Sequence, residues 1–228
     1  MQNYLAHRLG DAVTVFREGG VMMVPLLLSS ILALAVGISL ALTLRRKLIL
    51  PKDLVRAIGE LESPSDVEKV LARCHETTSP LGKVMMMALM NRDLTRDENQ
   101  EAVLLAGRQE ASAIGRGILI LQIIGATAPL MGLLGTVLGI VQIFGELHRQ
   151  GSGQIGVLSG GIKQALYTTV AGLTVAIPSL IAESYFSKVV DDIVLDMERL
   201  ASLLLTKIYS PRMREQSKAA EGKKGDKG

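Results

Sequence analysis

The sequence predicts an all-helical integral membrane protein with three transmembrane helices, the second and third extending as long helices beyond the membrane. Three long uncharged segments divide the 228 residues into apolar and charged blocks. Hydrophobic residues make up 48% of the chain and the mean hydropathy is +0.34, yet 21% of the residues are charged. Each uncharged segment is close to or above the roughly 20 residues that a helix needs to cross a bilayer.

The first uncharged segment, residues 19–44, is expected to be a retained transmembrane helix. A signal peptide is the alternative, but its apolar region would span only about 7–15 residues after a basic segment. Here the apolar segment is longer, acids and bases are mixed before it, and the basic cluster Arg45-Arg46-Lys47 follows it. We therefore expect residues 1–18 to be an exposed N-terminal segment ahead of a true span.

The basic cluster also predicts the orientation of the chain. Lys and Arg close to a span prefer the cytoplasmic side, so the first span runs from outside to inside. The remaining segments are then a cytoplasmic helical loop (45–116), a second span (117–145), an outer loop (146–163), a third span (164–186), a cytoplasmic helix (187–210) and a disordered basic tail (211–228) with Lys218, Lys223, Lys224 and Lys227.

The charged segments carry their own helix signals. Ser63-Pro64-Ser65-Asp66 and Ser79-Pro80 each place a capping serine before a proline at the first helical position. Residues 97–116 suit a helix that leads directly into the second span. Met85-Met86-Met87 is expected to serve helix packing. After the third span, apolar residues recur with a helical period, at Val189, Ile193, Met197, Leu200, Leu204 and Ile208.

Small and hydroxyl residues gather in the second and third spans. Gly132, Gly135, Thr136 and Gly139 lie on one helical face, which favours close helix packing. Thr136 could instead bond to its own helix, and Thr127, on the opposite face, is expected to do so. The polar residues of the third span are Gln164, Thr168, Thr169, Thr174 and Ser179.

The depths of these residues match between the two spans. At about 1.5 Å per residue, Thr136 lies about 13 Å and Thr169 about 9 Å inside the outer boundary. Pro129 and Pro178 lie about 24 Å and 22 Å inside, where each would bend its helix. Matched hydroxyls and matched kinks are what two helices lining one space would present.

Several kinds of site are not expected. The uncharged runs 19–44, 117–145 and 164–182 contain no Asp, Glu, Lys, Arg or His, and Glu183 closes the third, so any proton carrier inside the membrane must come from a partner. His7, His75 and His148 are scattered outside the spans, Cys74 is the single cysteine, and the net charge is only +3. We therefore expect no cofactor, no metal site, no enzymatic activity and no nucleic-acid partner. The three spans are expected to contact the lipid bilayer.

The segments A126-TAPLMGLLGTVLG139 and Q164-ALYTTVAGLTVAIP178 resemble the signatures of the MotA/TolQ/ExbB proton channel family. Three spans, an outer N-terminus and a large first cytoplasmic loop fit its ExbB/TolQ branch, and ExbB in general character. The resemblance implies a multi-pass protein of the bacterial inner membrane, with a periplasmic N-terminus and a cytoplasmic C-terminus. It also implies a pentameric ring with a pore lined by the second and third spans.

The resemblance further implies partners and site residues. A single-span ExbD- or TolR-like protein would sit in the pore, and its Asp would carry protons. A TonB- or TolA-like protein would receive the motion and drive outer-membrane transport. Thr136 and Thr169 match the pore threonines of the family, with Thr168 and Gln164 beside them. Some relatives carry Glu where this chain has Gln164, which cannot titrate.

Three other functions stay open at this point. A TolQ-like role in envelope maintenance and a gliding motor would use the same ring with a different output. A membrane scaffold that conducts nothing would need Gly132, Gly135 and Gly139 only for packing. A membrane enzyme has no catalytic constellation behind it.

Overall fold

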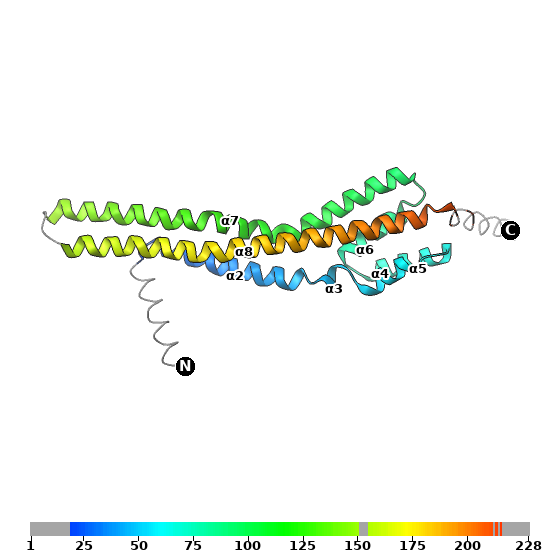
Figure 1. Cartoon of the computed structure of the whole chain (residues 1–228), viewed down its shortest axis with the longest axis horizontal. Helices are drawn as coiled ribbons and strands as arrows, with labels where there is room; N and C mark the ends of the chain where they lie inside the picture. Colours follow the sequence, from blue (N-terminus) through cyan, green and yellow to red (C-terminus); the bar gives the residue numbers. More distant parts are fainter. Residues whose placement is uncertain (1–18, 151–154, 212, 214, 216–228) are drawn as a thin grey trace, which may run out of the picture. The chain divides into compact units, whose positions relative to one another are not determined.

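The computed structural model describes residues 19–150, 155–211, 213 and 215, and this part of the chain is all-helical (Figure 1). The expected all-α architecture is confirmed for these residues. The predicted N-terminal segment 1–18, the middle of the predicted outer loop and almost all of the basic tail lie outside them. The helices are α2 (Met23–Thr43), α3 (Arg46–Ile49), α4 (Lys52–Gly59), α5 (Pro64–Glu76), α6 (Pro80–Met90), α7 (Arg96–Gln150) and α8 (Ile155–Ile208).

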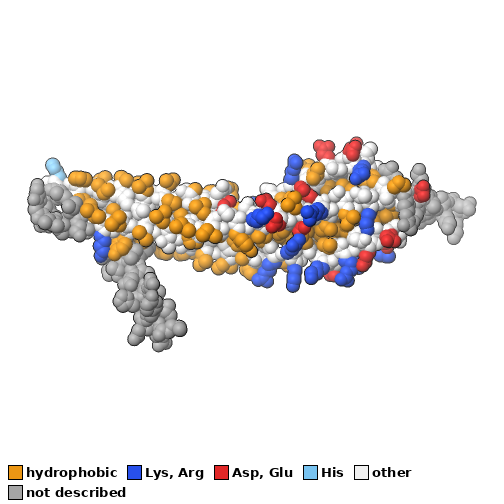
Figure 2. Space-filling model, viewed as in Figure 1, with side chains coloured by type: hydrophobic (Ala, Val, Ile, Leu, Met, Phe, Trp, Pro, Cys, Tyr) orange, Lys and Arg blue, Asp and Glu red, His pale blue; other side chains and the backbone are white. Residues whose placement is uncertain are grey.

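The chain divides into two compact units. The apolar unit comprises Met1–Leu40 and Gly117–Tyr185, and the polar unit comprises Ala41–Arg116 and Phe186–Gly228. On the apolar unit almost all of the side chains that Figure 2 colours are hydrophobic, whereas Lys, Arg, Asp and Glu are concentrated on the polar unit. This division confirms the separate apolar and charged blocks expected from the sequence.

Three of the described helices are long and apolar enough to cross a membrane: α2, α7 and α8. Large apolar side chains on them are exposed, among them Leu34 (67%), Leu130 (63%), Phe144 (70%) and Ile181 (66%). Clusters of exposed apolar residues of this size are rare on soluble monomers but suit a surface that faces lipid. The predicted three spans, two of them in long helices, therefore agree with the structure.

The outer connection is shorter than the expected loop of residues 146–163. Helix α7 continues to Gln150 and α8 begins at Ile155. A Cβ atom on Gly161 would overlap the side chain of Ile143, so the two helices still touch beyond the predicted end of the span. Residues 146–150 and 155–163 are thus helical, although the limits of the uncharged runs assigned them to the outer loop.

The helix starts in the polar unit follow the predicted capping chemistry. Asp66 accepts hydrogen bonds from the Ser63 backbone N–H at 3.1 Å and from its hydroxyl at 2.7 Å. Ser79 accepts the Gly82 N–H at 3.1 Å. Pro64 and Pro80 each stand at the start of the helix, where no backbone N–H is needed. Both predicted starts are confirmed.

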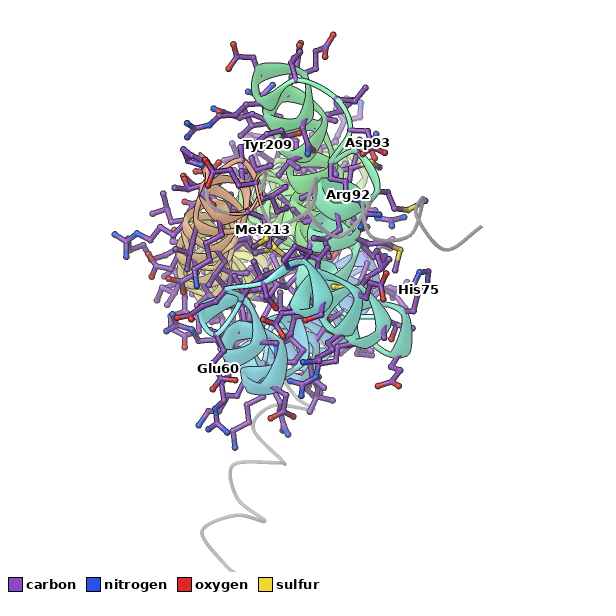
Figure 3. The ribbon with its side chains drawn as sticks, turned by 90° about the vertical axis from the view of Figure 1, so that its right-hand side faces the viewer. Glu60, His75, Arg92, Asp93, Tyr209 and Met213 are labelled. Carbon is purple, nitrogen blue, oxygen red and sulfur yellow. The ribbon has the colours of Figure 1, made fainter. Side chains whose placement is uncertain are left out.

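The end of α8 is bonded to the turn that precedes α7. Asn99 is fully buried and donates to the Ala88 carbonyl at 2.8 Å and to the Tyr209 hydroxyl at 3.0 Å. Tyr209 in turn donates to the Leu94 carbonyl at 2.9 Å. Figure 3 shows Tyr209 on the same side of the unit as Arg92 and Asp93 of this turn. Sequence reasoning did not single out Asn99 or Tyr209.

Apolar side chains form the core of the polar unit. The predicted stripe on α8 is confirmed at Ile193, Met197, Leu204 and Ile208, which are buried. Helix α4 packs against α5, and α5 packs against α6. Met85-Met86-Met87 is expected to serve helix packing. Met85 is fully buried, whereas Met87 is 40% exposed, so the structure confirms packing for Met85.

Cys74 provides a test of the packing of the polar unit. Its thiol is fully buried in α5, and burial raises its pKa to about 11. An unfolded thiol ionises near pH 8.5, so the stabilisation from keeping it neutral should be lost as the pH rises from about 8.5 towards 11. At pH 8 the folded protein should react with a maleimide far more slowly than the denatured protein, measured by mass spectrometry. Equal rates would contradict this packing.

Candidate functional site

Small residues allow close contact between α7 and α8 within the apolar unit. A Cβ atom on Gly172 would lie 2.6 Å from the Ala128 carbonyl oxygen and 3.1 Å from Gly132 Cα. On Gly135 it would lie 2.7 Å from Thr168 Cβ. Real Cβ atoms essentially never lie this close to another heavy atom, so these positions favour glycine. We call this contact the glycine seam; it comprises Gly132, Gly135 and Gly139 of α7 with Gly161, Ala165, Thr168 and Gly172 of α8.

The seam fixes the antiparallel register of the two helices. Gly132 lies against residues 168–172, Gly135 against Thr168, and Gly139 against Gly161 and Ala165. Because Thr136 directly follows Gly135, it lies within about one helical turn of the level of Thr169.

The same register applies to the two prolines. Gly125 lies against Leu180, and Ala128 lies against Gly172. Pro129 and Pro178 therefore also lie near one level, inside uninterrupted helices.

The two adjacent threonines of α8 have different surroundings. Thr168 is fully buried, and its hydroxyl donates to the carbonyls of Gln164 at 2.9 Å and Ala165 at 3.0 Å. Thr168 thus occupies a packing position in the seam rather than an accessible one. Thr169 is half-buried, and its hydroxyl reaches across to the Gly132 carbonyl at 3.4 Å.

Thr136 is half-buried on the other helix. Its hydroxyl donates to the Leu133 carbonyl of its own helix at 2.6 Å. A hydroxyl has one proton to donate and two lone pairs to accept with. Thr136 and Thr169 therefore both keep free acceptor capacity in this arrangement.

Helix α2 packs along one flank of the seam. Met23 and Leu26 form a buried cluster with Ala128 and Ala176, and Met131, Ala171 and Val175 pack against it.

Thr136 and Thr169 lie on the opposite flank. At about 100° per residue, Thr136 is about 140° around α7 from Met131. Thr169 is about 160° around α8 from Ala171. The two hydroxyls thus border one face of the helix pair, and α2 covers the other.

Gln164 lies at the α2 flank and not beside the two hydroxyls. A Cβ atom on Gly20 would overlap Gln164 Nε2 and lie 3.2 Å from Gln164 Cδ. Gly20 has φ 71°, a left-handed conformation that favours glycine. The Gln164 side chain therefore fills the space that Gly20 leaves open just before α2.

Three further hydroxyls of these spans bond to backbone carbonyls of their own helices. Thr127 donates to the Ile123 carbonyl at 2.8 Å, as expected, and Thr174 to the Val170 carbonyl at 2.7 Å. Ser179 is buried and donates to the Val175 carbonyl at 2.7 Å. Among the described residues, no group of three or more His, Cys, Asp or Glu is arranged to hold a metal ion.

Sequence reasoning missed part of the seam. Gly172 and Gly125 make contacts as close as those of the predicted glycines, and Gly161 does so near the outer end. The signal that could have found Gly161 and Gly172 is the recurrence of small residues at positions 161, 165, 168, 172 and 176 of α8. Gly20 carries no such signal, because its role depends on a side chain that is distant in the sequence.

Comparison with known sequences assigns the chain to a family. The sequence model of the MotA/TolQ/ExbB proton channel family matches residues 76–199, a range that includes all of α7 and the seam residues of α8. The chain belongs to the MotA/TolQ/ExbB proton channel family. Members of this family are channel and transport components, and the chain is ExbB-like within it.

Three relatives illustrate the similarity. A putative biopolymer transport protein ExbB-like 1 of Synechocystis is 34% identical over 169 residues, covering 73% of this chain and 66% of the relative. The biopolymer transport protein ExbB of Xanthomonas campestris is 36% identical over 113 residues, covering 49% and 45%. The biopolymer transport protein exbB1 of Vibrio cholerae is 28% identical over 165 residues, covering 71% and 72%. The match thus spans less than two thirds of the first two relatives.

The glycine seam can be tested with a matched pair of variants. Alanine exceeds glycine in helix propensity by about 1 kcal/mol, so a Gly→Ala change without a clash should be neutral or stabilising. Gly172→Ala should instead lower the free energy of unfolding by about 1–3 kcal/mol, because the new methyl group meets backbone.

The control for this variant is Gly37→Ala. Gly37 lies in α2, and nothing lies within 4 Å of its Cβ position. Thermal unfolding of the purified proteins in detergent measures both. If Gly172→Ala is as stable as Gly37→Ala, the seam is not as tight as described.

Proposed function

We propose that the chain is the ring subunit of a motor driven by the proton-motive force in the bacterial inner membrane. In this ExbB-like role it houses an ExbD-type single-span partner and energises TonB-dependent outer-membrane transport. The observation that carries the proposal is the pair of half-buried hydroxyls, Thr136 and Thr169, on the flank of the glycine seam that α2 leaves uncovered. The family membership supports a channel role for that face.

The chemistry of this face favours a partner that supplies the titrating group. The uncharged runs 19–44, 117–145 and 164–182 contain hydroxyls but no carboxylate, and a carboxylic acid in an apolar space needs hydrogen-bond partners in both protonation states. Thr136 and Thr169 can accept from a protonated partner acid. By turning their hydroxyls away from the Leu133 and Gly132 carbonyls, they can donate to the ionised acid.

Gln164 and Thr168 take other roles in this proposal. Gln164 lies against Gly20 and cannot titrate, so it holds α2 to α8 rather than relaying protons. Thr168 is buried in the seam. The proton route then consists of the partner's acid and the two remaining threonines.

Assembly follows from the same faces. We place the uncovered flank of the seam towards the axis of a pentameric ring and α2 towards lipid. The cluster Arg45-Arg46-Lys47 favours a cytoplasmic C-terminal end for α2, so the N-terminus is periplasmic and α7 and α8 extend into the cytoplasm. The proposed spans are residues 19–44, 117–145 and 164–186, with 187–210 as the cytoplasmic helix.

A TolQ-like role in envelope maintenance or a gliding motor would use the same subunit with a different periplasmic output. A non-conducting scaffold is the competing function, since the glycine seam alone would serve it. The two classes differ in what they require of the threonines. A scaffold tolerates loss of the hydroxyls as long as the shape is kept.

Thr136→Val and Thr169→Val test this difference. Valine keeps the shape of threonine but removes the hydroxyl, so each variant should assemble normally and lose proton-driven work, by about 10²-fold or more if the ionised acid is left without one donor. The measurement is partner-dependent proton uptake into vesicles, with co-purification of the ring as the assembly readout.

The matched controls are Thr127→Val and Thr174→Val. Both remove a hydroxyl that bonds only to its own helix, so both should keep full activity. If Thr136→Val and Thr169→Val also keep full activity, the result favours the scaffold, and this face of the helix pair is not part of a proton route.

A further inference from the structure

A hollow lined mainly by basic side chains lies in the polar unit between α3, α4 and α8. Its volume is about 670 Å³. Five basic residues from these three elements line it, chiefly through the apolar parts of their side chains: Arg46, Lys47, Lys52, Arg56 and Arg199.

The hollow carries a large uncompensated positive charge. Asp196 is the single acid in its lining, and it is bonded to Arg46. The other four bases are exposed, and none has an ion-pair partner among the residues that the structure describes. An anionic ligand would therefore meet about four free positive charges.

The orientation of the chain does not by itself account for this cluster. A preference for Lys and Arg beside a span explains Arg46 and Lys47, which come just after α2. It does not explain why Lys52 and Arg56 of α4 and Arg199 of α8 face the same hollow. Bases that only solvate a surface have no reason to converge.

The floor of the hollow is apolar. Leu50 is buried, Val55 and Leu200 are half-buried, and all three line the hollow beside the bases. A small free anion would gain nothing from these side chains. An amphipathic ligand with a phosphate and attached hydrocarbon would use both the bases and the floor.

The position in the chain indicates the source of such a ligand. Arg46 begins α3 three residues after Thr43, the last residue of α2, which is long and apolar enough to span a membrane. The hollow therefore starts just after the end of a span, on the side of the membrane where α2 has its C-terminal end. Basic pockets in this place bind anionic headgroups.

We propose that this hollow binds the phosphate-bearing headgroup of an anionic phospholipid from the leaflet at the C-terminal end of α2. Lys47, Lys52, Arg56 and Arg199 hold the phosphate, and Leu50, Val55 and Leu200 contact the glycerol and the start of the acyl chains. The lipid ties α4 and α8 together at the membrane surface. This site does not depend on the proposed proton-driven motor.

Native mass spectrometry of the purified full-length protein, incubated with phosphatidylglycerol or phosphatidylcholine, measures this binding. The unmodified protein should retain phosphatidylglycerol in clear preference to phosphatidylcholine. Each neutralised base should weaken the binding by about fivefold, so Lys47→Gln/Lys52→Gln/Arg56→Gln should lose on the order of 100-fold in affinity. Millimolar inorganic phosphate should not displace the lipid.

The matched control is Lys69→Gln/Arg92→Gln/Arg96→Gln, which removes the same charge outside the hollow and should keep the affinity. The charge-preserving variant Lys47→Arg/Lys52→Arg/Arg56→Lys should also keep it. If the two Gln variants lose the same amount of affinity for phosphatidylglycerol, the effect comes from net charge alone and the proposed site is wrong. Equal retention of the two lipids, or displacement by phosphate, would overturn it as well.

Discussion

The close backbone contact between α7 and α8 is the constraint on which the rest of the apolar unit depends. Gly132, Gly135 and Gly172 let the two helices approach until no Cβ atom fits between them. Lipid offers no hydrophobic drive for helix association, so tight packing and hydrogen bonding must supply it. The same contact sets the register that brings Thr136 level with Thr169 and turns both towards the flank opposite α2.

Local patterns predicted much of this architecture. The spans, the caps at Ser63 and Ser79 and the buried stripe on α8 each depend on residues within a few turns of one another. The contacts of single side chains did not follow from such patterns. Thr168 and Thr169 are neighbours about 100° apart, and only the position of α7 decides which is buried. Gln164 likewise contacts Gly20, although all of the helices from α2 to α7 lie between these two residues in the sequence.

Charged residues are confined to particular parts of the chain. The uncharged runs of the three spans (19–44, 117–145 and 164–182) hold hydroxyls without Asp, Glu, Lys, Arg or His, so in the proposed function the work done by protons needs an acid from another chain. The bases gather where α2 ends, around a hollow suited to an anionic headgroup. In the proposed function the chain thus offers one face to a partner helix inside the membrane and, by the further inference, a second surface to lipid.

Photo-crosslinking in the native membrane tests most directly whether the uncovered flank faces a partner helix. A diazirine side chain would replace Thr136, Thr169, Thr127 or Thr174, one at a time, in the full chain co-expressed with its single-span partner. The account predicts crosslinks to that partner from positions 136 and 169 and none from 127 and 174. Crosslinks from 127 and 174 alone would contradict it, because the partner would then lie on the other side of the helix pair.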